Sequence, residues 1–480
     1  MKKLLIANRG EIAVRIIHSA HKMGIATVAV YSDVDRDAPH VQLAGEAWNI
    51  GGPDSASSYL DMDKIIAVAK SSGADAIHPG YGFLSENAAF AERVTSEGII
   101  FVGPSPESIR VMGSKLEAKA TVSAYDIPMV PGTEAAITDA EAAMEIARKI
   151  GFPILIKASA GGGGKGMRIV EKEGDLASQM ERAISEAKAA FGDGAVFIEK
   201  YVSSPRHIEV QVLADTHGNT VHLFERECSI QRRHQKVVEE APSSVLTPEL
   251  REKMGQAAIH VARSCNYVGA GTVEFLLDAS HNFYFLEMNT RLQVEHPVTE
   301  LVTGKDLVRL QIEIAMGQEL PFKQEDLALK GHAIELRVYA EDPLNNFLPS
   351  TGTLETYQLP SGPGIRVDNG FKEKMKVPIY YDPMLSKLIC YANDRTEAIQ
   401  LMLKAIENYR VEGVETTLSF GSFVMQHPAF KSGEFDTHFV KQYYDPEVIA
   451  RTREYKAHLA ALVAFSEYLK DRKILRLPNA

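Results

Sequence analysis

Short apolar runs separated by amphipathic stretches open the chain. Four of these runs have the length of buried strands: residues 4–7, 27–31, 76–78 and 99–102. Between the first two, residues 11–23 carry apolar side chains at helical spacing, which gives a β-α-β unit. The pattern predicts a doubly wound α/β domain over residues 1–113. A dinucleotide-binding fold is the alternative, but residues 8–12 lack its three-glycine fingerprint.

The middle of the chain first predicts a smaller α/β unit and then a region dominated by strands. In the smaller unit, residues 114–201, strands are expected at 154–158, 167–170 and 196–200, with a helix at 176–190. Between residues 202 and 445, strand patterns dominate: 207–214, 220–225, 271–277, a run from 283, and 331–340.

The last segment predicts a helix that starts at a cap. Asp445 is suited to the N-cap position and Pro446 to the first helical turn. One helical face carries the large apolar side chains Val448, Tyr455, Leu459, Leu462 and Leu469. We expect this face to pack on its own domain; the alternative is contact with another subunit or partner.

Composition limits the function classes. At 480 residues the chain should form more than one folded unit, plausibly three, and its net charge of −11 argues against a general nucleic-acid surface. The three cysteines are scattered without disulfide or zinc spacing, which indicates a reducing cytosol. The N-terminal apolar run is too short for a secretory signal, and no segment reaches the ~18 apolar residues of a membrane helix. We therefore predict a cytoplasmic protein without membrane contact.

Two glutamates sit in neighbouring apolar strands. If residues 280–282 form the turn between these strands, Glu274 and Glu287 face each other, with Asn289 and Arg291 on the face of Glu287. Like charges opposite each other are unfavourable, by about 4 kcal/mol at ~4 Å in a partly screened site. A divalent cation would remove that cost, and oxygen ligands suit magnesium bound to nucleotide phosphates. The alternative is an exposed strand with incidental acids.

A glycine run lies between two predicted strands. Gly161 to Gly164 would let backbone N–H groups approach phosphate oxygens, although Gly166 after Lys165 excludes a P-loop. Lys157, in the apolar strand before the run, needs an anionic partner, and a triphosphate supplies one. The sequence favours a phosphate-covering flap over a flexible surface loop.

Further charged positions leave two interpretations open. Glu199, near the end of a strand, fits either adenine recognition or a simple salt bridge. Residues 225–242 are dense in charge of both signs, which is typical of a solvated loop. Beside an anion site, Lys236 and His234 become candidate oxyanion ligands. Cys228 is interpreted as a packing residue, because no activating base can be assigned to it.

Together these features resemble the ATP-grasp ligases, and within them the biotin carboxylases. The motifs that carry the resemblance are residues 7–13, 78–87, 161–167, 229–236 and 287–298, and Arg337 followed by 340–343. The resemblance implies a mixed α/β and α+β ATP-grasp fold. Its parts would be an N-terminal pre-ATP-grasp domain at 1–113, an ATP-grasp domain at 114–330 with a lid at about 131–201, a C-terminal domain at 331–445, and a helical tail at 446–480.

The resemblance also implies residue roles. For ATP it implies phosphate, flap and adenosine contacts: Lys115, Lys157, His207, Gly163, Gly164, Met167, Glu199, Lys200, Val202, Gln231 and His234, together with Glu274 and Glu287. For magnesium or manganese it implies Glu274, Glu287 and Asn289. For bicarbonate it implies Lys236, Arg291, Gln293, Val294 and Glu295. For biotin it implies Tyr81 and Arg337. The catalytic set would be Glu295, Arg337, Lys236 and Arg291.

The implied reaction is ligation that forms a carbon–nitrogen bond. ATP would phosphorylate bicarbonate to carboxyphosphate, and the carboxyl group would pass to biotin on a separate carrier protein. This is the first half-reaction of a multisubunit acyl-CoA carboxylase, such as the acetyl-CoA carboxylase of fatty acid biosynthesis, or of a pyruvate carboxylase. Carrier and carboxyltransferase subunits, and a homodimer, would be the partners. The alternatives are another carboxylate–amine ligase of the same fold and a non-catalytic nucleotide-binding regulatory subunit.

Overall fold

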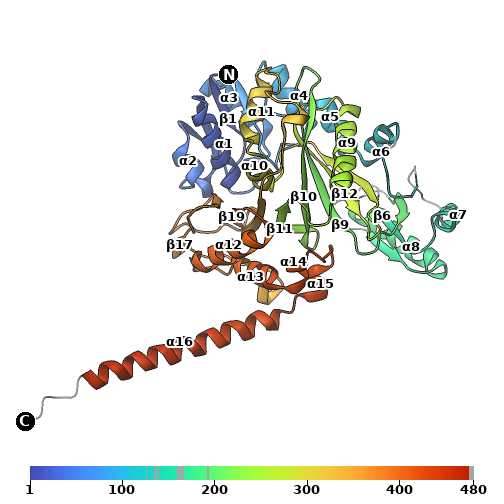
Figure 1. The fold of residues 1–480 in the computed structure, drawn as a ribbon. Coiled ribbons are helices and arrows are strands. Elements are labelled where there is room, and N and C mark those ends of the chain that lie inside the picture. Colours follow the sequence, from blue (N-terminus) through green and yellow to red (C-terminus); the bar gives the residue numbers. More distant parts are fainter. Residues whose placement is uncertain (126, 134–136, 138–139, 159–166, 192–193, 475–480) are drawn as a thin grey trace, which may run out of the picture.

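Five parallel strands form the first sheet of the computed structural model, in the order β3-β2-β1-β4-β5 (Figure 1). The model describes residues 1–125, 127–133, 137, 140–158, 167–191 and 194–474. The strands are β1 (Lys3–Ile6), β2 (Ala26–Ser32), β3 (Glu46–Gly51), β4 (Ala76–His78) and β5 (Ile100–Phe101). The helices beside them are α1 (Gly10–Lys22), α2 (Pro39–Leu43), α3 (Met62–Ser72), α4 (Ala88–Ser96) and α5 (Pro106–Gly113).

Helices cover both faces of this sheet. Successive residues of a strand point to opposite faces, and on β1 Leu4 and Ile6 join the apolar cluster that contains α1, while Leu5 joins the one that contains α3 and α4. This arrangement confirms the predicted doubly wound domain.

A three-stranded antiparallel sheet forms a separate lobe at one side of the molecule (Figure 1). Its strands are β6 (Ile154–Ala158), β7 (Met167–Val170) and β8 (Val196–Lys200), and all three match their predicted bounds. The helices of this region are α6 (Lys115–Ser123), α7 (Ala140–Ile150) and α8 (Leu176–Phe191). The predicted glycine flap between β6 and β7, with Gly163 and Gly164, lies outside the described residues.

An eight-stranded antiparallel sheet forms the centre, in the order β13-β12-β9-β10-β11-β14-β19-β18. Its strands are β9 (Arg206–Ala214), β10 (Thr220–Arg232), β11 (Gln235–Ala241), β12 (Gly269–Leu277), β13 (Phe283–Asn289), β14 (His332–Tyr339), β18 (Ile365–Asn369) and β19 (Met384–Ala392). Because β11 pairs with β14, the sheet continues across the domain boundary predicted at residue 330. The two predicted domains therefore share one backbone platform.

Helices and short strands complete the body. The remaining helices are α9 (Pro248–Ser264), α10 (His296–Thr303), α11 (Leu307–Ala315), α12 (Arg395–Asn408), α13 (Leu418–Gln426), α14 (Pro428–Ser432) and α15 (Phe439–Tyr443). The short strands are β15 (Glu341–Asp342), β16 (Leu348–Pro349), β17 (Thr356–Gln358) and β20 (Arg410–Glu412). Pro248 and Thr247, which caps Leu250, give α9 a defined start, and Phe420 and Phe439 lie in the core of the C-terminal part.

The charge-dense segment 225–242 is not a solvated loop. It forms most of β10 and β11, which meet at a tight turn where Arg233 and His234 adopt positive φ. Most of its charged side chains are buried. Among them, Arg226 pairs with Glu209, and Glu225 pairs with Arg251 at 2.8 Å, whereas Arg233 at the turn is exposed. The interpretation as a solvated loop is wrong because both faces of these strands are covered. Even consecutive charged residues such as Glu225 and Arg226 are therefore buried, and partners on neighbouring elements neutralise them.

The chain ends in α16 (Pro446–Ile474), which projects away from the body (Figure 1). The predicted face is exposed along its length, with Tyr455 and Leu462 each 64% accessible. The expectation that this face packs on its own domain is therefore wrong. The helix axis leads outward from its start, where Tyr444 donates to the carbonyl of Pro343, so later turns cannot reach the body. In the described part of the chain, no helix has both the length and the apolar character needed to cross a bilayer.

Truncation tests whether α16 contributes to the stability of the body. Deleting residues 455–480 should change the melting temperature by less than about 2 °C, because exposed positions usually contribute within ~0.5 kcal/mol. Differential scanning calorimetry measures this. A matched truncation after residue 435 also removes Phe439, which is fully buried, and should lower the melting temperature clearly. Equal losses in both truncations would show that α16 supports the body.

Candidate functional site

A cavity of about 1160 Å³ opens where the N-terminal domain, the three-stranded lobe and the eight-stranded sheet meet. Most of the predicted site residues line it: Tyr81, Lys157, Met167, Glu199, His207, Gln231, His234, Lys236, Glu274, Glu287, Asn289, Arg291, Gln293, Val294 and Arg337. Site residues that were predicted in segments far apart in the sequence therefore line the same cavity. Glu295 lies directly behind the wall, fully buried.

Five predicted nucleotide contacts are not among the lining residues, and two of them, Gly163 and Gly164, lie outside the described residues. Lys115 begins α6, and its side chain is outside the described part. The N–H of Lys200 donates to the carbonyl of Pro131 at 2.7 Å, and its ammonium donates to Gly151 at 2.9 Å. Val202 follows β8 without lining the cavity. The ATP roles of these residues stay predictions.

The register of the acidic hairpin is the predicted one. Glu274 of β12 stands opposite Glu287 of β13, and a β-bulge follows at Phe275. Glu274 is 5% exposed, whereas Glu287 is exposed at the rim of the cavity. The chain itself compensates Glu274: Lys236 donates to it at 2.9 Å and Asn289 at 3.0 Å, and His207 Nε2 lies 3.0 Å away. The repulsion expected between the facing acids is therefore reduced within the chain itself, without a divalent cation.

Lys236 is the centre of this compensation. From β11 its ammonium donates to Glu209 at 2.5 Å, Glu274 at 2.9 Å and Glu295 at 2.7 Å. Burial opposes its charge, but the three carboxylates hold the pKa of Lys236 well above its usual value. Each carboxylate also meets a second basic group: Arg226 at Glu209, His207 at Glu274, and Arg337 at Glu295.

The ionisation of this cluster follows from those pairs. Burial alone would raise the pKa of Glu295, but Lys236 and Arg337 lower it well below its usual range. The pKa of Glu274 is likewise lowered, against burial, by Lys236 and His207. Both acids are therefore ionised at neutral pH, and Glu295 can accept a proton once a ligand weakens its contact with Lys236.

Three other side chains hold Arg291 at the cavity. Its Nε donates to Glu86 at 2.8 Å, Nη1 to Gln293 at 2.8 Å, and Nη2 to Asn289 at 3.2 Å. Glu86 comes from the loop before α4, so the N-terminal domain orients a guanidinium of the central region. Sequence reasoning did not assign Glu86 a role, because its contact spans 205 residues of chain.

Lys157 and Glu199 also meet, with Lys119 as a third member. Glu199 pairs with both ammonium groups, and against its burial these two cations lower the pKa of Glu199. Lys157 therefore has the anionic partner that was predicted for it, but within the chain Glu199 supplies the negative charge that was expected from a triphosphate. Lys119 was missed, although it lies one helical turn after Lys115 and therefore on the same face of α6.

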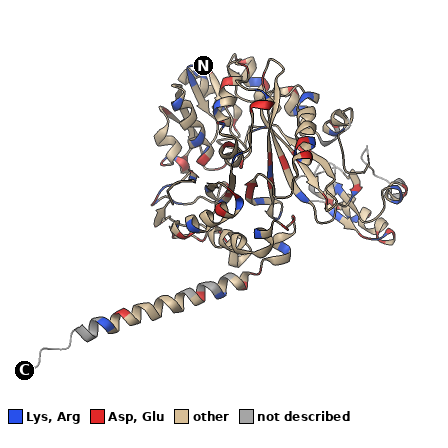
Figure 2. Ribbon diagram, in the orientation of Figure 1, with Lys and Arg blue, Asp and Glu red and all other residues tan. Residues whose placement is uncertain are grey.

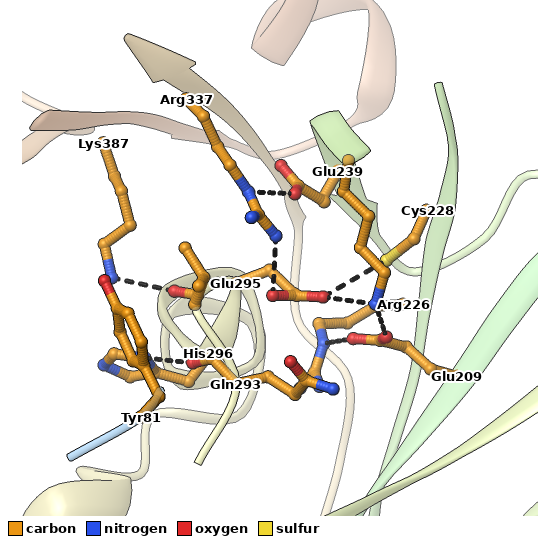
Figure 3. A network of polar contacts seen from close by, with 12 residues as sticks. Tyr81, Glu209, Arg226, Cys228, Glu239, Gln293, Glu295, His296, Arg337 and Lys387 are labelled. Carbon is orange, nitrogen blue, oxygen red and sulfur yellow. Dashed lines mark hydrogen bonds and ion pairs between the residues drawn. The ribbon is translucent and has the colours of Figure 1, made fainter. Parts of the chain in front are cut away.

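Arg337 and Tyr81 mark the other end of the cavity. Arg337 donates through Nε to Glu239 at 2.6 Å and through Nη2 to Glu295 at 2.9 Å (Figure 3). The Tyr81 hydroxyl donates to Glu11. The cavity thus has a carboxylate-rich wall near the acidic hairpin and a guanidinium, anchored on both sides, near Tyr81.

Three family models match consecutive parts of the chain. These are "Biotin carboxylase, N-terminal domain" over residues 1–109, "Carbamoyl-phosphate synthase L chain, ATP binding domain" over 114–323, and "Biotin carboxylase C-terminal domain" over 335–442. Their limits leave α16 outside all three.

Curated relatives cover the same region. The chain is 52% identical to biotin carboxylase from Nostoc sp. and to biotin carboxylase 1 from Bacillus subtilis, over 92% of its length and 98% and 99% of theirs. It is also 52% identical to the mitochondrial methylcrotonoyl-CoA carboxylase subunit alpha of Mus musculus, but it spans only 62% of that protein's length.

Solved structures agree in fold. A biotin carboxylase–β-γ-ATP complex from Campylobacter jejuni has a TM-score of 0.88 at 45% identity, with 92% of this chain and 99% of that chain covered. The biotin carboxylase domain dimer of Hydrogenobacter thermophilus 2-oxoglutarate carboxylase, with MgADP and bicarbonate, has a TM-score of 0.88 at 46% identity, with 93% and 98% covered. The predicted ATP-grasp architecture is confirmed, and the chain belongs to the biotin carboxylase family.

Proposed function

We propose that this chain carboxylates biotin with ATP and bicarbonate, a ligation that forms a carbon–nitrogen bond. The observation that carries the proposal is the convergence of Lys236, Arg291, Glu295 and Arg337 on one cavity beside the acidic hairpin. Nucleotide binding alone does not require this set. Membership of the biotin carboxylase family supports the same reaction.

The acidic hairpin is the proposed end for the phosphates. Glu274 and Glu287 face each other, and Asn289 adds an amide oxygen, which is the donor set that magnesium or manganese takes. When bound, the ion would neutralise charge on the nucleotide phosphates. His207 and Lys157 line the same cavity and would contact phosphate oxygens, while Gln231, His234 and Glu199 would contact adenosine.

Arg291 and Lys236 form the proposed bicarbonate pocket with Gln293, Val294 and Glu295. A guanidinium offers the planar carbonate two parallel hydrogen bonds, which an ammonium cannot copy. Glu295 would take the bicarbonate proton while a bicarbonate oxygen attacks the γ-phosphorus and ADP leaves. Carboxyphosphate then gives CO₂ and phosphate. Because bicarbonate would compete for Lys236, its binding would free Glu295 to act as a base.

Arg337 and Tyr81 form the proposed biotin end. The ureido nitrogen of biotin would form a bond to CO₂ as its proton passes to the phosphate released from carboxyphosphate. The fixed guanidinium of Arg337 would stabilise the oxygen that becomes negative. We propose that the biotin is presented by a carrier protein and that the carboxyl group passes on through a carboxyltransferase. The final acceptor, an acyl-CoA or pyruvate, is not determined by this site.

The homodimer and the cytoplasmic location expected from the sequence stay predictions.

Two alternatives remain for the same fold. A different carboxylate–amine ligase would cleave ATP without stimulation by biotin. A non-catalytic regulatory subunit would bind ATP but would have no use for Glu295 behind the cavity wall, where it meets Lys236 and Arg337. We expect ATP cleavage to depend on bicarbonate and to rise when free biotin is added. Phosphate release measured with each component omitted separates the three cases.

Glu295→Gln should remove the base while preserving the fold of the pocket. We expect biotin carboxylation to fall by on the order of a hundredfold, the usual contribution of a positioned acid or base, with ATP affinity nearly unchanged. Incorporation of labelled bicarbonate into biotin and calorimetric titration with ATP measure the two quantities. Near-normal carboxylation would remove Glu295 from the base role.

Lys157→Ala should weaken ATP binding by roughly tenfold or more, because a hydrogen bond to a charged group contributes about 1.5–3 kcal/mol. Titration calorimetry with Mg·ATP gives the dissociation constant. Lys172→Ala is the matched control, since Lys172 is an exposed lysine in the same lobe, and it should bind ATP normally. An unchanged constant for Lys157→Ala would contradict the phosphate role.

A further inference from the structure

Two buried glutamates face each other at the centre of the eight-stranded sheet. Glu239 of β11 is directly opposite Glu335 of β14 in the antiparallel ladder. Residues paired in this way project from the same face with Cβ atoms about 5 Å apart. Glu239 is 1% exposed and Glu335 is 0% exposed, so water does not separate or screen them.

Their hydrogen bonding is incomplete. Both carboxyl oxygens of Glu335 and the Oε2 atom of Glu239 are buried without a hydrogen-bond partner. Two ionised carboxylates can only accept hydrogen bonds, so they cannot satisfy each other. A single proton turns one of them into a donor and pairs oxygens of both. Burial agrees with this: it raises the pKa of Glu335 well above its usual value and that of Glu239 to about 7.

The surrounding charges are engaged elsewhere. Lys387 of β19 lies 3.2 Å from Glu11 and 3.7 Å from Asp368, and it donates to the carbonyl of Val294 at 2.8 Å. From β11, Lys236 is held by its own three glutamates. From the segment before α10, Glu295 adds a further negative charge. Burial favours the neutral form of Glu335 and outweighs the opposing effect of Lys387 and Arg337, neither of which forms an ion pair with it among the described residues, so its pKa stays raised.

Arg337 connects this pair to the cavity. It lies two residues after Glu335 on β14 and therefore on the same face. Its Nε donates to Glu239 at 2.6 Å, its Nη2 to Glu295 at 2.9 Å, and its Nη1 lies 3.4 Å from the hydroxyl of Tyr339 (Figure 3). Glu239 is thus the anchor that fixes one edge of the guanidinium.

We propose that Glu335 keeps a proton that it shares with Glu239, and that this carboxyl pair positions Arg337 against Glu295. The proton leaves one negative charge on the pair and ties Oε2 of Glu239, so Oε1 stays aimed at Arg337. Glu335 is a positioning residue, since it acts only through Glu239 and Arg337. The consequence for biotin rests on the function proposed above, whereas the shared proton does not.

The proton is tested without any assay of activity. Between pH about 5 and 8 the folded chain would keep a proton that the unfolded chain releases, so the contribution of this carboxyl pair to stability falls as pH rises in this window. The Glu335→Gln variant has no shared proton to release when it unfolds. Its melting temperature relative to the wild type should therefore increase with pH. In infrared spectra at pH 7, the carbonyl band of protonated carboxylic acids should be weaker in Glu335→Gln than in the wild type, by the intensity of one carboxyl group. A pH-independent difference together with an unchanged band would overturn the proposal.

The positioning role is tested by kinetics. Glu335→Leu leaves Oε2 of Glu239 without a donor and should lower kcat for biotin by roughly tenfold or more, the usual contribution of residues that orient a functional group. Glu335→Gln, whose amide still donates, should recover most of this loss. Loss of the shared proton at alkaline pH should lower kcat of the wild type, and this fall should move to higher pH in Glu335→Gln. KM for ATP should not change in either variant.

Two outcomes separate the possible failures. If Glu335→Gln is as impaired as Glu335→Leu and its pH profile is unshifted, Glu335 is not a proton-sharing positioning residue. If the wild type does not carboxylate biotin at all, the proposed function fails, while the unfolding and infrared experiments still decide whether the proton is shared.

Glu239→Gln, which weakens the anchor of Arg337 directly, should lower kcat even when Glu335 is intact.

Discussion

The ammonium of Lys236 is the interaction on which the rest of the site depends. It brings Glu209, Glu274 and Glu295, from three separate elements, to within hydrogen-bonding distance of one atom. Removing one partner of a buried ion pair typically costs about 3–5 kcal/mol, because a charge remains buried without compensation. Here one lysine compensates three carboxylates. The same contacts therefore fix the shape of the anion pocket and stabilise this part of the sheet.

The cations of the site are balanced in pairs within the chain. Lys157 meets Glu199, Lys236 meets Glu295, and Arg291 meets Glu86. Figure 2 shows acidic and basic residues interspersed through the centre of the molecule, not gathered into fields of one sign. An incoming phosphate or carbonate therefore shares or replaces an internal carboxylate. Because the partners can exchange in this way, the buried lysine and arginine side chains are paired when no ligand is bound and can still bind an incoming anion.

The eight-stranded sheet explains how the two ends of the cavity stay aligned. The acidic hairpin is at one edge, Lys236 is on β11, and Arg337 is on β14, the next strand. Hydrogen-bonded strands move together, so the proposed phosphate and biotin ends cannot shift independently. By contrast, α16 leaves this platform and lies outside the family-matched residues (Figure 1).

The sequence by itself determined the elements and the local register. Alternation along 271–289 was enough to place Glu274 opposite Glu287, because the turn between them is short and the pairing is local. Glycine and lysine spacing and the quoted motifs identified the family and most residues of the cavity. Tertiary structure alone decided which charges pair: Lys157 with Glu199, Arg291 with Glu86, and Glu239 opposite Glu335. These contacts join segments that are 42 to 205 residues apart, and no periodicity in a sequence records such distances. The direction of α16 could likewise not be predicted from the sequence, because an apolar helix face does not identify the surface that covers it.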